Sequence, residues 1–578
     1  MQRSKQAADS RTRSRSPRRY SHSLQGNIKE WGQGILTGPR FWQSAYNLHL
    51  DYGSQLGIDR IVGGIYDSSD QNIHRHLMHV FGTTLGFDRL LTTFTSDLIS
   101  AGLLPSQLFR LVFKHNRATF LRIYGFSENL EQYWEQLFST PDGRAMRFEN
   151  PSLRGKTPFQ LRHTAPVTLH EDAGPFAKQS SCNLIQYSAV TAKGKDYETK
   201  LLYASFLKNT SQPASFGADA YEAFFDDMQQ LATGYDKEGK PYASDGDTVY
   251  ALALSWGKCD GEQSVNEWGL QTHGGKDECC GLCLADRAGR PFSNLHSDSP
   301  WRGTEYVYMD KATFCARCKH GHPVERSPFW GRFFYRQDIM HQLDNNGVAS
   351  IVAGSVLVKR TQNPALGANQ TERLKQINSE LDIFYSDHIV SSRLPKLLLQ
   401  NLTIKQSNIG RRQAFLSGQV VKAANTRCVM PFISILARKY IHGSDFVSSS
   451  IRKLCESLCA IYECLYSAGY FLSDEQLKFL EKHVLRFGRH FMVACNSDDP
   501  SSSILMFCMR PKVHQMQHLP LQARLHNPRF LQCYGEESFV GVMCKVWAAS
   551  KSGPQSQATI QRTVLIKYLC FLCVALGL

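Results

Sequence analysis

Two pairs of cysteines in the sequence have the spacing of zinc ligands. Cys280 and Cys283 form one Cys-x-x-Cys pair, and Cys315 and Cys318 form another, separated from the first by residues 284–314. This spacing lets both thiolates of a pair face one tetrahedral Zn²⁺ ion at about 2.3 Å each. Because four thiolates leave no open position on the ion, the cysteines predict a structural zinc site, with free buried cysteines as the alternative. Further potential ligands nearby are Cys259, Cys279, His320 and His322.

A histidine motif lies much later in the chain. His514 and His518 are four residues apart, so on a helix they share one face. The two imidazoles could bind a metal or contact phosphate, and an incidental pair is the third interpretation. The positive charge of this passage predicts contacts with a DNA backbone. The residues predicted to contact nucleic acid are Arg510, Lys512, His514, His518 and Arg529.

Acidic residues follow two of the predicted strands. Two-metal phosphoryl transfer needs carboxylates from separate parts of the chain to converge on a pair of divalent ions. Asp172 lies beyond a strand predicted over 165–170, and Asp260 lies beyond one predicted over 248–256. If these two strands are adjacent in the sheet, the two acids are neighbours. For each acid taken alone, an ordinary surface position is the alternative. The candidates for a third carboxylate, from a helix, are Glu536 and Glu537.

The elements that would position these residues are strands interrupted by one helix. We expect Ala173-Gly-Pro175 to break the chain after the first strand, and a helix over 219–232 to separate the third strand from the fourth. Short apolar and alternating runs predict strands over 165–170, 182–190, 200–207, 248–256 and 331–335.

Much of the remaining chain has helical periodicity. The longest run, 446–495, is broken near Gly469 and again at Ser473-Asp474. Its cysteines at positions 455, 459 and 464 have helical spacing, which is typical of core packing rather than of a metal site. Other helices are predicted over 88–99, 106–120 and 128–138.

Four local blocks carry a resemblance to a known family. In their order over roughly residues 160–550, they resemble transposases with an RNase H-like core, of the eukaryotic Plavaka and Kyakuja–Dileera–Zisupton groups, which are distant relatives of the hAT elements. The blocks are His170-Glu-Asp-Ala-Gly-Pro-Phe176, the Cys280-x-x-Cys283 block with Ala285-Asp286, Asp338-Ile-Met-His-Gln342, and Pro511-Lys-Val-His514 followed by Asn527-Pro-Arg529 and Glu536-Glu537.

The resemblance implies an Asp-Asp-Glu triad that binds two Mg²⁺ or Mn²⁺ ions. Asp172 matches the first aspartate of such a triad. The second is Asp260 by strand order, or Asp338 by the Asp338-x-x-His341 motif. Glu536 and Glu537 compete for the third position. The candidate catalytic residues are therefore Asp172, Asp260, Asp338, His341, Glu536 and Glu537.

The predicted fold class is α/β, with an RNase H-like mixed sheet core interrupted by a Cys/His-rich insertion and a large all-α insertion, and preceded by a helical N-terminal region. The predicted segments are a disordered basic tail (1–27), a helical region (28–150), the first part of the core (160–258), a zinc-binding-like insertion (259–326), a continuation of the core (327–360), a helical insertion (361–505), and the completion of the core with a C-terminal helix (506–578).

Composition and charge limit the location and partners of the protein. The chain carries 66 Lys+Arg against 51 Asp+Glu, and its basic tail has no apolar residue to bury over 11–19. Such a tail indicates a nuclear protein that binds DNA, with a solvated segment of no function as the alternative. We expect no secretory signal, and the apolar passage 564–578 is too short to span a bilayer, so no membrane partner is predicted. Seventeen cysteines without a signal favour reduced thiols. A homo-oligomer is left open.

Two functions remain after other chemistries are excluded. Glycine-rich nucleotide-binding motifs and a Gly-x-Ser-x-Gly nucleophile motif are absent, and no small-molecule cofactor is predicted. The leading hypothesis is a transposase-like nuclease or strand transferase that acts on DNA with two divalent ions and carries a structural Zn²⁺. The alternative is a non-catalytic, zinc-stabilised nucleic-acid-binding protein derived from a transposon, so enzymatic activity is left open.

Overall fold

The computed structural model describes most of the 578-residue chain. The basic tail up to residue 25, Asp260, Cys318 and His320 lie outside the described residues. The described ranges are 26–34, 41, 45, 76–84, 86–95, 98–208, 217–259, 268, 279–317, 322–364, 367–405, 411–417, 421–441, 443, 445–497, 502–551 and 555–577.

The chain forms two compact units, and each is made of segments that alternate along the sequence. Unit 1 comprises Met1–Ser127, Glu171–Ala251 and Gly535–Leu578, and unit 2 comprises Glu128–His170 and Leu252–Tyr534. Each unit therefore depends on residues that are far apart in the chain.

The main sheet has seven strands in the order β1-β2-β5-β4-β3-β8-β9. It is mixed: β4 and β5 pair antiparallel, whereas β8 and β9 pair parallel, with Gly257 opposite Tyr335. Every residue of β8 is buried, which is typical of a strand covered on both faces. The α/β class predicted from the sequence is confirmed. The strands are β1 (Thr92–Thr93), β2 (Ala101–Gly102), β3 (Thr164–Ala177), β4 (Ser180–Ala189), β5 (Leu201–Leu207), β8 (Ala251–Cys259) and β9 (Tyr335–Gln337).

The first predicted strand is longer than expected. β3 continues through Asp172 and past Gly174, so the break predicted at Ala173-Gly-Pro175 is wrong and Asp172 lies within the strand. A Cβ on Gly174 would lie 2.5 Å from Cys544 Sγ, on α22 (Tyr534–Ser550). The glycine therefore serves the close approach of a helix to the strand rather than a turn.

Two other predictions fail at short elements. Residues 88–99 are not a helix: one 3₁₀ turn, η3 (Phe87–Leu90), is followed by β1, where β-branched Thr92 and Thr93 pair with β2. The strand predicted over 331–335 begins only at Tyr335, because the preceding residues form a turn in which Phe334 N–H donates to Gly331 O. Asp338 therefore follows β9 directly.

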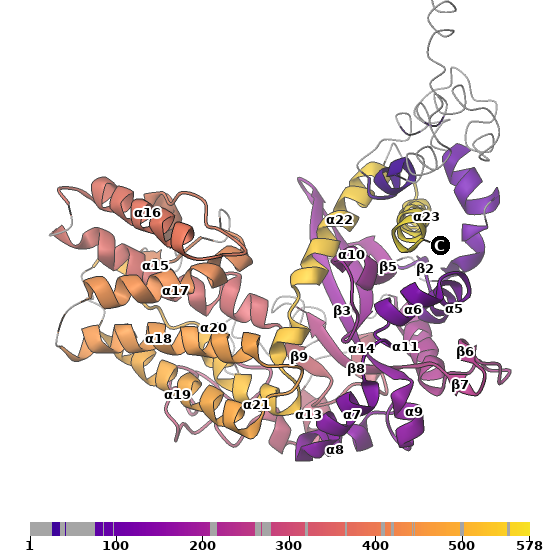
Figure 1. Ribbon diagram of the computed structural model, residues 1–578, viewed down its shortest axis with the longest axis horizontal. Coiled ribbons are helices and arrows are strands. Elements are labelled where there is room, and N and C mark those ends of the chain that lie inside the picture. Colours follow the sequence, from indigo (N-terminus) through magenta and orange to yellow (C-terminus); the bar gives the residue numbers. More distant parts are fainter. Residues whose placement is uncertain are drawn as a thin grey trace, which may run out of the picture. The chain divides into compact units, whose positions relative to one another are not determined.

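Unit 1 also contains helices and a small hairpin. Figure 1 shows its terminal helix α23 in yellow beside β5, and Tyr568 Oη on α23 accepts from Leu202 N–H at 3.1 Å. The helices are α5 (Pro105–His115), α6 (Arg117–Ile123), α10 (Asp196–Thr199), α11 (Ala218–Thr233), α22 and α23 (Gln557–Leu576), with turns η2 (Val80–Thr84) and η3, and the hairpin strands are β6 (Ser244–Asp245) and β7 (Thr248–Val249).

Helix α23 is long and apolar enough, by length and composition alone, to cross a membrane. In this structure 72% of its most apolar window is buried within the fold. Lys567 on this helix is buried and donates from Nζ to Ala549 O at 2.9 Å, and burial lowers the pKa of Lys567 to about 8. The terminal apolar passage is thus a buried helix, as the sequence predicts.

Unit 2 is largely helical. Figure 1 shows α17, α18 and α19 side by side, and they share a large apolar core with α15. The break predicted at Ser473-Asp474 is confirmed, because Ser473 Oγ caps α19 by accepting from Gln476 N–H at 3.2 Å. The larger helices are α7 (Leu130–Ser139), α8 (Pro141–Glu149), α15 (Val348–Gln362), α16 (Gln370–Asp387), α17 (Ala423–Tyr440), α18 (Phe446–Ser467) and α19 (Asp474–Asn496).

Short elements complete unit 2. Three strands form a second small sheet in the order β10-β11-β12. The strands are β10 (Thr403–Lys405), β11 (Arg412–Ala414) and β12 (Ile504–Leu505); the short helices and turns are α9 (Pro158–Arg162), η4 (Tyr306–Tyr308), α13 (Lys311–Arg317), α14 (Pro323–Arg326), η5 (Met340–Asp344), η7 (Leu399–Asn401), α20 (Pro511–Gln515), η8 (Met516–His518), α21 (Leu519–Leu525) and η9 (Pro528–Leu531).

The core of unit 2 can be tested at Ile461, which is fully buried on α18. Ile461→Ala should lower the free energy of unfolding by about 2–5 kcal/mol, because it removes buried apolar surface and leaves a cavity. The measurement is urea unfolding followed by far-ultraviolet circular dichroism. Ile389→Ala is the matched control, since Ile389 is fully exposed and its truncation should change the free energy little. Equal losses in the two variants would contradict this packing.

Candidate metal centre

Four side chains of unit 2 form a buried Cys/His cluster that could hold a metal ion such as zinc. Cys280 and Cys283 come from an irregular segment after β8, His514 from α20 and His518 from the end of η8. All four are completely buried. Pro511 begins α20, where its missing N–H costs nothing, and the continuing helical turns place the two histidines on one face.

The distances within the cluster match tetrahedral zinc. All four ligand atoms lie within 4.8 Å of one another. Nε2 of His518 lies 3.5 Å from Cys280 Sγ, and Nε2 of His514 lies 3.3 Å from Cys283 Sγ. The two Nε2 atoms are 3.3 Å apart. With bonds of about 2.3 Å to sulfur and about 2.0–2.1 Å to nitrogen, a tetrahedral ion separates S from N by about 3.5 Å and N from N by about 3.3 Å.

Backbone amides hold the thiols in place. Leu282 N–H donates to Cys280 Sγ, and Ala285 N–H donates to Cys283 Sγ, each at 3.4 Å. In each case the donor N–H lies two residues after the cysteine, so the local turn itself provides the hydrogen bond to the sulfur. Such bonds favour the charged thiolate, which is the form that binds metal.

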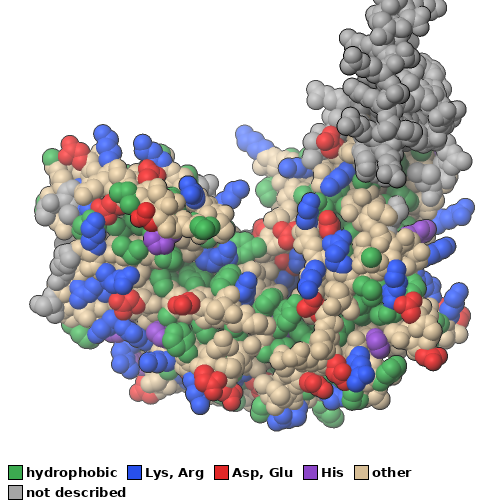
Figure 2. Space-filling view, viewed as in Figure 1, with side chains coloured by type: hydrophobic (Ala, Val, Ile, Leu, Met, Phe, Trp, Pro, Cys, Tyr) green, Lys and Arg blue, Asp and Glu red, His purple; other side chains and the backbone are tan. Residues whose placement is uncertain are grey.

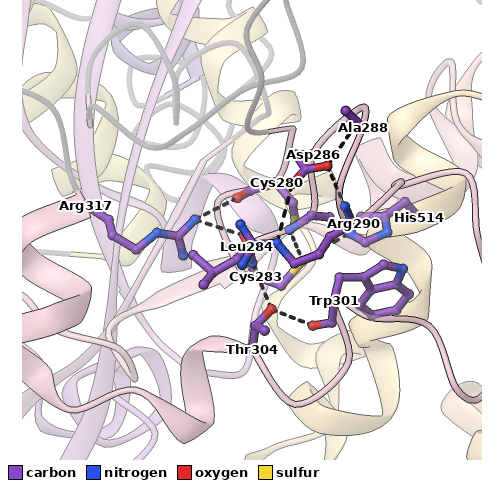
Figure 3. A network of polar contacts seen from close by, with 11 residues as sticks. Cys280, Cys283, Leu284, Asp286, Ala288, Arg290, Trp301, Thr304, Arg317 and His514 are labelled. Atoms are coloured by element: carbon purple, nitrogen blue, oxygen red, sulfur yellow. Dashed lines mark hydrogen bonds and ion pairs between the residues drawn. The ribbon is translucent and has the colours of Figure 1, made fainter.

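The segment that carries the two cysteines is tied to its surroundings by polar contacts (Figure 3). Arg317, at the end of α13, donates from Nη2 to Cys283 O at 2.9 Å, and Leu284 N–H donates to Thr304 Oγ1 at 3.0 Å. Asp286 accepts from Ala288 N–H and from Arg290 N–H, at 2.9 and 2.7 Å. These contacts restrain the backbone of the segment that carries the two sulfur atoms.

Packing orients the two imidazole rings. The ring of Trp301 lies edge-on to both, with centroid distances of 4.5 Å to His514 and 5.4 Å to His518. The Nδ1 atoms of both histidines are buried without a hydrogen-bond partner among the residues that the structure describes. The rings are thus held by the indole and by their own helical turns rather than by hydrogen bonds at Nδ1.

Electrostatics in the cluster favour one thiolate beside a neutral imidazole. Burial raises the pKa of Cys280, but the hydrogen bond from Cys283 and the charges of His518 and His514 outweigh it, so the pKa lies well below its ordinary value. Burial, followed by the hydrogen bond and charge of Cys280, raises the pKa of Cys283. Burial lowers the pKa of His514, which favours the neutral form of its ring. A thiolate and neutral imidazoles are the forms that zinc binds.

The cluster includes one of the two predicted cysteine pairs. Cys315, on α13, is half-buried and is not part of the cluster, and Cys318 lies outside the described residues. His322 instead caps α14, since its Nδ1 accepts from Val324 N–H at 3.2 Å. Among the described residues, Cys259 and Cys279 are buried but do not belong to the cluster.

The pairing of Cys280 and Cys283 with the two histidines was not predicted. Each half was noticed separately, because Cys-x-x-Cys and His-x-x-x-His are local patterns. The halves are joined across 231 residues between Cys283 and His514, and no local signal spans that distance. Two cysteines and two histidines together make a common ligand set for structural zinc, and this composition could have suggested that the two motifs share one ion.

The structure brings Asp338 and His341 together in unit 2. Asp338 Oδ2 lies 2.6 Å from His341 Nδ1, and Oδ1 accepts from Met340 N–H and Cys533 N–H, each at 2.9 Å. Burial raises the pKa of Asp338, but the hydrogen bond and charge of His341 outweigh it, so the pKa lies below its ordinary value. The predicted Asp-x-x-His motif therefore forms an oriented, ionised carboxylate.

Two of the candidate acids, Asp172 and Glu536, are buried in unit 1. Asp172 lies on β3, and its Oδ1 accepts from Ala173 N–H at 2.7 Å. Glu536, in the first turn of α22, forms an ion pair with Lys200 at 2.7 Å, whereas the neighbouring Glu537 is half-buried. Asp260 follows β8 directly but lies outside the described residues.

The predicted DNA-contacting residues lie in two kinds of surroundings. His514 and His518 are buried in the cluster, which favours the metal interpretation over phosphate contact. Lys512 donates to His341 O at 2.7 Å, Arg510 donates to Gln413 Oε1, and Arg529 donates to Tyr466 O. Contacts of these three cations with DNA stay a prediction. On the face in Figure 2, Lys and Arg side chains are interspersed with Asp and Glu.

No model of a known protein family matches the chain, and none of the curated proteins compared with it matches either. The fold and the site by themselves define a mixed α/β protein with a buried Cys/His cluster that could hold a metal such as zinc.

A second buried polar cluster surrounds Asp344 at the end of η5. Its carboxylate accepts from Tyr534 Oη at 2.6 Å and from Tyr462 Oη, and Arg427 Nη1 lies 3.9 Å away. Burial raises the pKa of Asp344 to about 7. Since an unfolded Asp titrates near 3.9, the folded protein holds this proton more tightly between these two pH values.

Asp344→Asn should remove a pH-dependent penalty. The stabilising proton is fully present below pH 3.9 and is lost as the pH rises through 7, so ionised Asp344 weakens the wild-type fold at high pH. The free energy of unfolding of the variant, minus that of wild type, should increase by about 2–3 kcal/mol from pH 5 to pH 8. Urea unfolding at four pH values measures this difference. Asp226→Asn, at an exposed position of α11, is the control and should show no such change with pH. A pH-independent difference for Asp344→Asn would refute the prediction.

Proposed function

We propose that Cys280, Cys283, His514 and His518 bind one structural Zn²⁺ ion. The supporting observation is that two sulfur–nitrogen separations and the nitrogen–nitrogen separation are close to those around a tetrahedral ion. Four protein ligands leave no position for water or substrate, so the ion stabilises the fold and does no chemistry itself. It joins the segment after β8 to α20 and η8, and so closes a very long loop.

Zinc content and two kinds of variant test this proposal. The purified full-length protein should contain about one zinc per chain by plasma mass spectrometry, and Cys283→Ala or His518→Ala should remove it. Each loss should lower the thermal midpoint by about 5 °C or more, because it removes several kcal/mol of binding free energy.

Cys315→Ala is the matched control for the zinc experiment. It removes a thiol of the other predicted pair, which lies outside the cluster, so zinc content and midpoint should stay at the wild-type values. If Cys315→Ala removes the metal and His518→Ala does not, the ligand set proposed for the ion is incorrect.

We also propose that the zinc-stabilised protein acts on DNA as a transposase-like nuclease or strand transferase with an RNase H-like core and two Mg²⁺ or Mn²⁺ ions. The strand order β5-β4-β3-β8-β9 supports this, because the first predicted strand lies next to the fourth. Asp172 lies on β3, and Asp260 and Asp338 directly follow β8 and β9. Together with Glu536 or Glu537, these acids would supply the carboxylates that two-metal phosphoryl transfer requires.

The alternative from a different class is a non-catalytic protein that only binds nucleic acid. It rests on the same zinc centre and on the basic tail, which also indicates a nuclear location. Both proposals include DNA binding, so only a measurement of DNA cleavage distinguishes them.

A nicking assay on supercoiled plasmid with Mg²⁺ or Mn²⁺ distinguishes the two functions. Wild type should convert the plasmid to the open-circular form, and Asp172→Asn should reduce this to background because the substitution removes a metal-binding charge. Asp226→Asn, at an exposed position of α11, is the control and should cleave as wild type does. A wild-type protein that retards DNA in a gel, holds its zinc and shows no cleavage would establish the binding protein instead.

A further inference from the structure

A cavity of about 300 Å³ lies in unit 2 beside the last turns of α15 and α17. One part of its wall is apolar, with Val356, Leu436 and Ile441, and the other carries the cations Lys359 and Arg360. None of the residues that line it is acidic. The volume is at the lower end of the range for small-molecule sites and is equivalent to about ten water molecules.

Arg360 is an unusual side chain for a protein interior. It is 2% exposed, and none of its three guanidinium nitrogens has a hydrogen-bond acceptor among the described residues. One face of the guanidinium lies 3.8 Å from the ring centroid of Tyr440. Glu380 Oε1 forms an ion pair with Nη2 at 3.5 Å, but no hydrogen bond joins them. A buried guanidinium with no hydrogen-bond acceptor among the described residues is costly, because its donors have lost water and the ion pair with Glu380 replaces it only in part.

Glu380 does not neutralise the charge around the cavity. The same carboxylate accepts from Tyr440 Oη at 2.6 Å and forms an ion pair with Lys439 Nζ at 3.6 Å. Lys359, Arg360 and Lys439 supply three positive charges against this one carboxylate, a difference of +2. The C-terminal end of α15 contributes about −0.5 charge from its helix dipole, so the net charge around the cavity stays positive.

These observations define the chemistry of a fitting ligand. A carboxylate or phosphate supplies acceptors in the geometry that a guanidinium fork prefers, and it neutralises the remaining charge. An apolar body attached to that group would pack against Val356, Leu436 and Ile441. Glu380 can release its looser contact with Arg360, because it keeps Tyr440 Oη and Lys439. Duplex DNA does not fit, since its backbone phosphates cannot reach a guanidinium that is 2% exposed.

We infer that this cavity is a binding site for a small organic anion, with a carboxylate or phosphate head at Arg360 and Lys359 and an apolar body against α15 and α17. The site is independent of the zinc cluster and of the candidate catalytic acids, none of which lines it.

Calorimetric titration of the full-length, zinc-loaded protein tests the inference. The probes are phenyl phosphate and benzoate, which carry both head and body, with inorganic phosphate and phenol as the separate parts. At least one complete probe should bind with an affinity about tenfold or more above that of either part. The stronger of the two identifies the head group. Binding of both probes no tighter than inorganic phosphate or phenol would overturn the inference.

Variants locate the binding. Lys359→Gln, at the half-buried edge of the cavity, and Arg360→Gln should each weaken the probe about tenfold or more. Lys375→Gln, at an exposed position of α16, makes the same charge change away from the cavity and should leave the affinity unchanged. Circular dichroism and zinc content show whether each variant folds. If Arg360→Gln does not fold, the affinity of Lys359→Gln decides the result. Equal weakening by Lys359→Gln and Lys375→Gln, or displacement of the probe by a short DNA duplex, would show surface electrostatics and refute the site.

Discussion

The convergence of two thiols and two imidazoles in a fully buried part of unit 2 is the constraint on which its arrangement depends. Cys280, Cys283, His514 and His518 are all completely buried, and buried polar groups destabilise a fold unless they have partners. Here they face one another at the separations of a tetrahedral ion. The segment after β8 and the turns from α20 through η8 are therefore held together by a polar centre instead of by apolar packing alone.

The same helical turn links this centre to the Asp338 motif. On α20, Lys512 lies two residues before His514, and its Nζ donates to His341 O at 2.7 Å and to Asn345 O at 3.1 Å. These carbonyls belong to the turn that begins at Asp338, whose carboxylate binds His341. The contacts that hold α20 therefore also help to hold the ionised carboxylate of Asp338 at the end of β9. The Cys/His cluster and the Asp338 carboxylate therefore depend on the same helical turn.

Charge is used differently in the three buried polar regions of unit 2. At the Cys/His cluster, two imidazoles lower the pKa of one thiol. At Asp344, burial raises the pKa of a carboxyl that two tyrosines hold by hydrogen bonds. At Arg360, the guanidinium has the ring of Tyr440 and an ion pair with Glu380, but no hydrogen-bond acceptor among the described residues. At Asp344 the carboxylate has donors within the fold, whereas we propose that a metal ion completes the first site and an anion the third.

The sequence by itself determined the elements and motifs that depend on neighbouring residues. The helices of 446–495, the break at Ser473-Asp474 and the Cys-x-x-Cys and His-x-x-x-His patterns were all visible, because such signals act within a few residues. Only the tertiary structure decided which of these patterns meet. It joined Cys283 to His514 across 231 residues, and it explained Gly174 by the approach of a helix where the sequence indicated a break. It also buried Arg360, because contacts between distant segments are set by packing, which no local pattern records.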